Sequence, residues 1–227
     1  MKTIPPKPPA RPFLNRYTSL PVLIDILVHK RIVLLKPSSW EDRNDSFYLE
    51  RYKEEKKLKA VLALCFSTKR ETFHHWKVFS AGTGGVCIEF DKARLLEGMT
   101  TEAGFTLRKV DYAFIKNVVS NRPQLADWPF LKRKPFEDEG EFRIVYENKT
   151  KEERTKEVPI QLSSIRMITL SPWMPETVAK TVTKVLQDLP GCSSMTVGRS
   201  SLLETSRWQQ AIRSMRTASS QEVEVAD

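Results

Sequence analysis

Two glutamates separated by one glycine are the side chains of this sequence best suited to chemistry. Glu139 and Glu141 flank Gly140, and residues 141–146 alternate between polar and apolar positions as a β-strand does. If the strand is already extended at Glu139, both carboxylates point to one side. The two carboxyl groups of such a pair can have different pKa values, and the pair can bind a sugar hydroxyl or hold a cation. The alternative is an exposed strand entrance whose charges face water.

Two other polar sites precede this pair in the chain. Arg16 and Tyr17 end a short first strand, and Ser67 follows an apolar strand. The order of arginine, small hydroxyl and Glu-x-Glu resembles the Arg-Ser-Glu class of ADP-ribosyltransferases. The resemblance implies an ADP-ribosyltransferase-like fold and NAD as the cofactor or substrate.

The same resemblance implies a role for each residue. Arg16 would hold a phosphate of NAD, and Ser67 would order the ribose pocket. Glu141 would be the catalytic carboxylate that holds a ribose hydroxyl and stabilises an oxocarbenium-like transition state, because a cation developing at the anomeric carbon needs a fixed negative charge nearby. Glu139 would help to activate the acceptor. Tyr17, Trp40 and Trp76 are the other candidates for binding NAD, the two tryptophans as parts of the pocket wall.

Structural alternatives exist for the first residues of this set. Arg16 could pair with Glu141 or Asp138 in a purely structural ion bridge. Ser67 and Thr68 could be a helix cap, since Thr68 and Glu71 have the spacing of a capping box.

Trp76 is also a candidate core anchor beside Phe79. His74 and His75 should point to different sides of a helix, and no cysteine or carboxylate completes a metal site with them. We therefore predict no metal site. The buried thiol of Cys65 is unsuited to act as a nucleophile.

The polar loop at residues 36–46 has a cation-binding alternative. Asp42, Asn44 and Asp45 offer the hard oxygen ligands that divalent cations prefer. The spacing of a calcium loop is absent, however, so a cap and turn is the favoured interpretation.

The composition describes a soluble, basic, globular protein. The chain has 227 residues, 40% of them hydrophobic, and a formal net charge of +9, which favours an anionic partner or substrate such as nucleic acid. Three cysteines lack metal-ligand spacing and leave an odd thiol, which fits a reducing cytoplasm. No apolar run approaches the length of a membrane span. We expect a cytoplasmic protein.

The pattern of elements predicts a single α+β domain with a mixed central sheet flanked by helices. Residues 1–12 carry five prolines and are expected to be a disordered arm, residues 13–213 form the domain, and residues 214–227 lose the apolar pattern and are expected to be a disordered tail. The helix expected over residues 175–189 should bury four apolar side chains: Val178, Val182, Val185 and Leu189.

A second resemblance covers residues 13–210. The ordered motifs at residues 15–17, 40–45, 65–67, 76, 85–91 and 136–143 are similar to those of a bacterial family without an assigned reaction, some of whose members lie in defence-type neighbourhoods. The sequence thus favours an NAD-dependent ADP-ribosyltransferase-like or NAD-cleaving enzyme with an unknown acceptor, in a defence role. A non-catalytic protein that binds nucleic acid through residues 132–134, and a metal-dependent hydrolase or nuclease, remain open.

Overall fold

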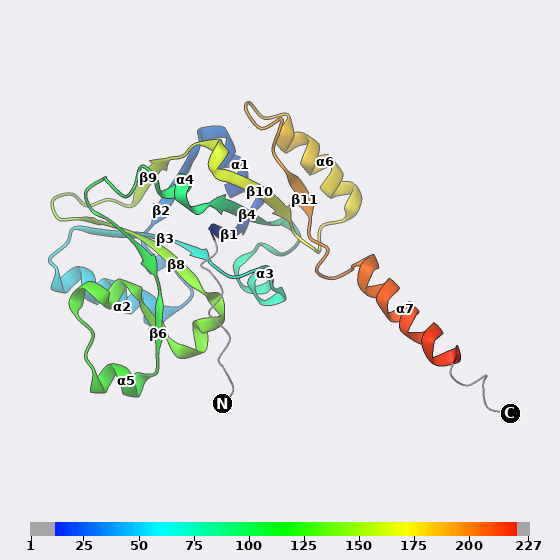
Figure 1. Cartoon of the computed structure of the whole chain (residues 1–227). Helices are drawn as coiled ribbons and strands as arrows, with labels where there is room; N and C mark the ends of the chain where they lie inside the picture. The colour runs from blue at the N-terminus through cyan, green and yellow to red at the C-terminus, as the bar shows by residue number, and fades with distance from the viewer. Residues whose placement is uncertain (1–11, 222–227) are drawn as a thin grey trace.

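The computed structural model describes residues 12–221, with side chains described as far as residue 215 (Figure 1). Except for Pro12, the proline-rich arm expected at residues 1–12 lies outside the described residues, and so does the end of the expected tail, residues 222–227.

The strands and helices have the following bounds. The strands are β1 (Phe13–Ser19), β2 (Arg31–Leu35), β3 (Ala60–Ser67), β4 (Gly85–Asp91), β5 (Phe105–Lys109), β6 (Asp111–Ala113), β7 (Leu131–Arg133), β8 (Glu141–Asn148), β9 (Thr155–Pro159), β10 (Ile165–Leu170) and β11 (Val197–Arg199). The α-helices are α1 (Leu20–His29), α2 (Arg43–Glu55), α3 (Phe73–Phe79), α4 (Lys92–Leu96), α5 (Ile115–Ser120), α6 (Glu176–Gln187) and α7 (Ser206–Gln221). The 3-10 helices are η1 (Pro37–Ser39), η2 (Gly82–Gly84), η3 (Leu125–Phe130), η4 (Lys134–Glu139) and η5 (Leu162–Ser164).

Within the described residues, nine strands form one mixed sheet, and the fold is a single α+β domain as expected. The path runs β11-β10-β4-β1-β3-β2-β9, with β8 paired to β3 and β5 paired to β8. The pair β10–β11 is parallel, whereas the other pairs of this sheet are antiparallel. β6 and β7 form a separate parallel pair.

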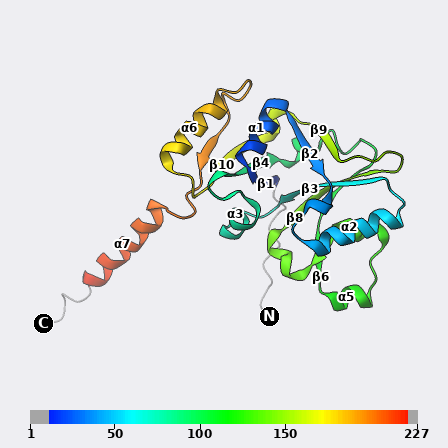
Figure 2. The same cartoon turned by 180° about the vertical axis from the view of Figure 1, so that it is seen from behind.

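The two faces of the sheet bury different side chains, because strand residues alternate. Phe142, Ile144 and Tyr146 of β8 join the larger core, to which α1 contributes. Val145 lies on the other face, against Leu49 of α2. Figures 1 and 2 show α1 and α2 on opposite sides of the sheet. The alternation predicted for residues 141–146 is confirmed, and it places Glu141 and Arg143 on the α2 side.

β3 pairs with three strands, β8, β1 and β2, and the length of the pairing differs greatly. β2 meets it at Leu35 opposite Ala63. β3 pairs with β8 along its whole length, from Ala60 opposite Asn148 to Ser67 opposite Glu141. It pairs with β1 at a single position, Asn15 opposite Ser67. Beyond that position β1 and β3 part, and the sheet opens between them.

Two helices, α6 and α7, differ from the expectation, each in its own way. In α6 the buried residues are Ala179 and Leu186, while Val178 and Val185 are exposed. The prediction of an inward face was wrong for these two valines, because the apolar stripe of α6 also contains Ala179 and Leu186, and the helix is rotated so that this second pair is buried.

The helix α7 extends to Gln221, across residues 214–221 that we expected to be a disordered tail. The expectation missed the helical spacing of Trp208, Ile212 and Met215, whose side chains are all exposed. In both views α7 points away from the sheet (Figures 1 and 2).

Candidate active site

A cavity of about 760 Å³ lies where β1 and β3 part. Its volume is within the range of ordinary small-molecule sites. The wall is built from β1 and β3, from the loop before α2 and its first turn, from the end of α3, and from residues 132–141. Lining residues include Asn15, Arg16, Tyr17, Trp40, Asp45, Cys65, Ser67, Phe79, Lys132, Phe136, Glu139 and Glu141.

Glu139 and Glu141 both line this cavity, although the strand does not extend through them. Glu139 ends the 3-10 helix η4, and β8 begins at Glu141. Between them Gly140 has φ 54° and ψ 48°, in the left-handed region that favours glycine. A Cβ at this glycine would lie 2.5 Å from the side chain of Lys69. The turn at Gly140, and not strand alternation, therefore brings the two carboxylates to one site.

The pairing of β3 with β8 completes this arrangement. Ser67 lies opposite Glu141, and Cys65 lies opposite Arg143. Side chains of directly opposed residues share one face of a sheet. The register thus places all four side chains on the α2 side, at the end of the sheet nearest the cavity.

Arg143 organises the charges of the site. It is fully buried, and it donates to both oxygens of Glu141 at 2.6 and 3.0 Å and to both oxygens of Asp45 at 2.6 and 3.1 Å. It also donates to the carbonyl of Pro129 at 2.8 Å, and its guanidinium lies 4.8 Å from the ring centre of Trp40. The planar fork of arginine suits such two-point contacts.

Lys132 joins the third carboxylate to this group. Its Nζ is 2.6 Å from Glu139, 3.5 Å from Glu141 and 3.9 Å from Asp45. The cluster consequently contains three carboxylates and two cations. When all five are ionised it carries one excess negative charge beside the cavity.

The two glutamates have opposite titration behaviour. Burial disfavours the charged form of Glu141, but Arg143 and Lys132 more than offset it and lower the pKa of Glu141 to about 2. Burial also acts on Glu139, and there Lys132 offsets it only in part, so that the pKa of Glu139 is raised. Glu141 is therefore a fixed negative charge, and Glu139 is a better proton acceptor than an ordinary glutamate.

The depressed pKa of Glu141 predicts a stability that depends on acidity. Its contribution is fully present above the ordinary pKa of 4.5 and is lost as pH falls toward about 2. The shift corresponds to about 3 kcal/mol in the free energy of unfolding. Urea unfolding of the wild type and Glu141→Gln should therefore differ by a margin that is constant from pH 7 to 5 and shrinks between about 4.5 and 2. A margin independent of pH would contradict this assignment; the exposed Glu137→Gln serves as control.

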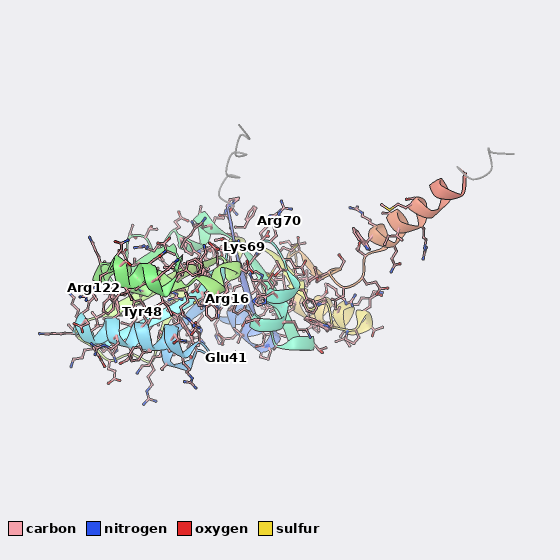
Figure 3. All side chains as sticks on the ribbon, turned by 90° about the horizontal axis from the view of Figure 1, so that it is seen from below. Arg16, Glu41, Tyr48, Lys69, Arg70 and Arg122 are labelled. Atoms are coloured by element: carbon pink, nitrogen blue, oxygen red, sulfur yellow. The ribbon has the colours of Figure 1, made fainter. Side chains whose placement is uncertain are left out.

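Arg16 is partly buried in the cavity wall, unlike the exposed Arg43 and Arg133, and it has no carboxylate partner among residues 12–215. Its Nη1 donates to the backbone carbonyl of Cys65 at 3.1 Å, across the gap between β1 and β3. The alternative of a structural ion bridge to Glu141 or Asp138 is not found in that part of the chain. Burial lowers the pKa of Arg16, so an anion in the cavity would relieve an uncompensated charge. Figure 3 shows Arg16 on the face seen from below, between Lys69 and Glu41.

The three aromatic candidates have different positions. Trp40 lines the cavity and is half-buried. Tyr17 lines it through its ring, since its hydroxyl is inaccessible and has no partner among the described residues. Trp76 is fully buried, donates to Glu71 at 2.7 Å and does not line the cavity. The expectation that Trp76 forms a pocket wall is corrected: it is a core anchor, and Phe79 is the α3 aromatic at the cavity.

The residues that cap α2 and α3 test two of the alternatives considered from the sequence, the cap and turn at residues 36–46 and the capping box at Thr68 and Glu71. Asp42 caps α2 by accepting from the backbone N–H groups of Asn44 and Asp45, as the cap-and-turn interpretation predicts. The cap of α3 is Thr72, so the capping-box alternative for Thr68 and Glu71 is wrong. Ser67 instead donates to the carbonyl of Glu139 at 2.7 Å.

The basic run at residues 132–134 does not act as one surface patch. Lys132 points into the carboxylate cluster, Lys134 pairs with Glu137, and the guanidinium of Arg133 lies over the ring of Phe136. The three side chains therefore do not form the row of phosphate contacts that the nucleic-acid alternative requires.

Sequence reasoning missed four residues of the site: Asp45, Lys132, Arg143 and His75. An arginine in the middle of an apolar strand is a signal that could have been followed, because a buried cation needs a partner. His75 was considered only as a metal ligand. It is buried against Ser67, whereas His74 is exposed, as the helix geometry predicts.

The other expected properties concern metals, thiols and membranes. Within the described residues, no three His, Cys, Asp or Glu side chains are arranged to hold a metal ion. The three cysteines are free thiols, and burial followed by Glu141 raises the pKa of Cys65 well above its ordinary value. No helix in residues 12–221 has the length and hydrophobicity required to cross a membrane.

Comparison with known proteins gives limited information. No protein-family model matches the chain, and no curated protein matches it. The structure of Thermus sp. 2.9 DarT in complex with carba-NAD+ is similar with a TM-score of 0.44 and 10% identity, over 86% of this chain and 97% of that chain. The structure of Thermus sp. 2.9 DarT in complex with ADP-ribosylated ssDNA gives 0.45 and 12%, over 85% and 95%. Likeness at this level carries no inference about the chemistry of this chain, which has to come from the site.

Proposed function

We propose that this protein is an ADP-ribosyltransferase-like enzyme that cleaves the bond between nicotinamide and ribose in NAD. The observation that carries the proposal is the pair Glu139 and Glu141 at one cavity, with pKa values driven in opposite directions. Two carboxylates separated in this way divide acid–base and electrostatic roles between them.

The cavity offers groups that suit the parts of NAD. Arg16 presents a cation that no carboxylate within residues 12–215 neutralises, as a diphosphate requires. The rings of Tyr17, Trp40 and Phe79 provide flat apolar surface for the bases. The cluster of three carboxylates and two cations lies at the other part of the wall, where its excess negative charge can face the ribose.

In the proposed reaction the bond from the ribose anomeric carbon to the nicotinamide nitrogen breaks, and nicotinamide leaves with the electron pair. Positive charge then develops on the ribose, and the ionised Glu141 stabilises it. Both oxygens of Glu141 are held by Arg143, so the carboxylate is already oriented before the charge appears. Glu139 takes the proton of the attacking acceptor or water. Its Oε2 is bonded to Lys132, which leaves the other oxygen for this task.

The test is to incubate the protein with NAD labelled in the adenylate and, separately, in the nicotinamide. Release of nicotinamide is expected, and adenylate label moves to an acceptor if one is supplied. Protein, RNA and single-stranded DNA are to be compared as acceptors. No release of nicotinamide under any of these conditions would end the proposal. Nucleic-acid binding that weakens with salt, without turnover, would favour the non-catalytic alternative; a role in defence is a separate proposal that this assay does not address.

Replacing Arg16 by Gln tests the phosphate assignment. Loss of a charge-assisted contact costs about 1.5–3 kcal/mol, so the KM for NAD should rise about 10- to 100-fold. Nicotinamide riboside lacks the diphosphate, and its KM should change little. The matched control is Arg94→Gln, because Arg94 also donates to a backbone carbonyl, that of Ser163, outside the cavity. Equal effects on NAD and nicotinamide riboside would contradict the assignment.

A further inference from the structure

His75 connects α3 to the turn that carries the two glutamates. It is buried and its ring stacks on Tyr17, with centroids 5.3 Å apart. Its Nε2 is 3.0 Å from Ser67 Oγ and 3.2 Å from the carbonyl oxygen of Glu139. Its Nδ1 is 2.5 Å from Thr72 Oγ1. Both ring nitrogens are thus engaged.

The hydrogen bonds of the neighbours determine where the proton of His75 lies. The carbonyl of Glu139 can only accept, so Nε2 must carry the proton to make a favourable contact with it. Ser67 already donates to that same carbonyl and accepts from the N–H of Lys69. Thr72 accepts from the N–H of His75, and its own hydroxyl proton is free to point at Nδ1. One arrangement satisfies every group: neutral His75 with its proton on Nε2.

The same turn is held from a second side. The carbonyl of Gly140 accepts from the N–H and the hydroxyl of Thr68, both at 2.8 Å. Hydrogen bonds from the end of β3 and from His75 therefore hold the carbonyls of Glu139 and Gly140 in place. Because Gly140 has a left-handed conformation that glycine adopts easily, these bonds decide where the Glu139 carboxylate is directed.

We propose that His75 is a positioning residue of this active site, which orients Ser67 and the Glu139 peptide through its Nε2–H group. The role rests on the proposed function, since it serves the NAD-cleaving site. His75 does not line the cavity, so it acts on the substrate indirectly, and its polar contacts with lining residues are those to Ser67 and Glu139. Among the described contacts, His75 is the residue of the site that contacts both Ser67 and Glu139 through a single atom, its Nε2.

Two substitutions separate positioning from packing. His75→Phe keeps a ring between Tyr17 and Phe79 but has no donor, whereas His75→Gln can place an amide N–H near the position of Nε2. We expect His75→Phe to lower kcat about 10- to 100-fold while the KM for NAD changes less than about threefold, on the scale of one or two buried hydrogen bonds. His75→Gln should recover kcat to within about fivefold of the wild type. The matched control, His74→Phe, changes the exposed neighbour on the same helix and should leave both constants unchanged.

A double-mutant cycle shows whether His75 acts through Ser67. Adding His75→Phe to Ser67→Ala should cost much less than it costs the wild type, because coupled residues are not additive. A purely structural role predicts additive losses. Correlation spectra of protein labelled with ¹⁵N-histidine should also show His75 neutral with its proton on Nε2 near pH 7, without any substrate.

The outcomes are distinct. Full activity of His75→Phe, additive losses with Ser67→Ala, or a proton on Nδ1 would each overturn the positioning role while NAD cleavage by the wild type still supports the function. If the wild type releases no nicotinamide at all, the proposed function fails, and the positioning role fails with it.

Discussion

Glu141→Gln is expected to lower kcat for NAD cleavage by about 10²–10³-fold, the usual cost of losing one oriented group that stabilises transition-state charge. The amide keeps the size of the side chain and removes its negative charge. Since the charge is needed in the transition state more than in the ground state, the KM for NAD should change far less than kcat. Nicotinamide release under saturating NAD measures the effect.

Two comparisons keep this result interpretable. Glu137→Gln removes an exposed carboxylate of the same 3-10 helix and should retain wild-type turnover. Glu139→Gln should reduce transfer to an acceptor, and its loss should be relieved in part at higher pH, where the acceptor loses its proton without help. If Glu141→Gln binds NAD and folds like the wild type yet turns over at an unchanged rate, Glu141 is not the catalytic carboxylate.

The largest loss of stability is expected from Arg143→Met. Removing the buried guanidinium leaves Asp45 and Glu141 without their bidentate partner, and breaking a buried ion pair in this way costs about 3–5 kcal/mol. For a chain of this size the melting temperature should fall by roughly 10 °C. The pKa of Glu141 should rise, because burial is then opposed by Lys132 and Cys65 without Arg143. Thermal and urea unfolding at pH 7 and pH 5 measure both effects.

The control uses an arginine with a similar pairing on the surface. Arg51 also contacts two carboxylates, Glu54 and Glu55, but its side chain is half exposed, and Arg51→Met should cost under about 1 kcal/mol. A triple variant that combines Arg143→Met with Asp45→Asn and Glu141→Gln should recover much of the stability lost in Arg143→Met. In the triple variant no uncompensated charge remains among these three residues. A triple variant less stable than Arg143→Met would contradict the explanation.

Local pattern was enough to predict much of this protein. Alternation in residues 141–146 identified which side chains of β8 enter the core, and the cap at Asp42 followed from its side chain and spacing. These features depend on neighbours within a few residues.

The parts that failed depend on distant contacts. Arg143 meets Asp45 across 98 residues of sequence, and no local pattern reports that distance. The orientation of α6 about its axis depends on which residues of its apolar stripe meet the sheet. Arg16 was predicted as a site residue and lines the cavity, but its lack of an ion pair within residues 12–215 follows from the parting of β1 and β3, which only the three-dimensional register reveals.

That parting also has a mechanical consequence. One group of strands, β11, β10, β4 and β1, meets the others by backbone pairing at a single position of β3. The side chains of Asn15 and Arg16 add hydrogen bonds to the carbonyls of Lys69 and Cys65. A molecule that filled the cavity would contact β1 and β3, and so both groups, at once. Its binding free energy would then add to the free energy that holds the two groups of strands together. Under the proposed function, the NAD that the cavity binds would therefore also link the two groups of strands.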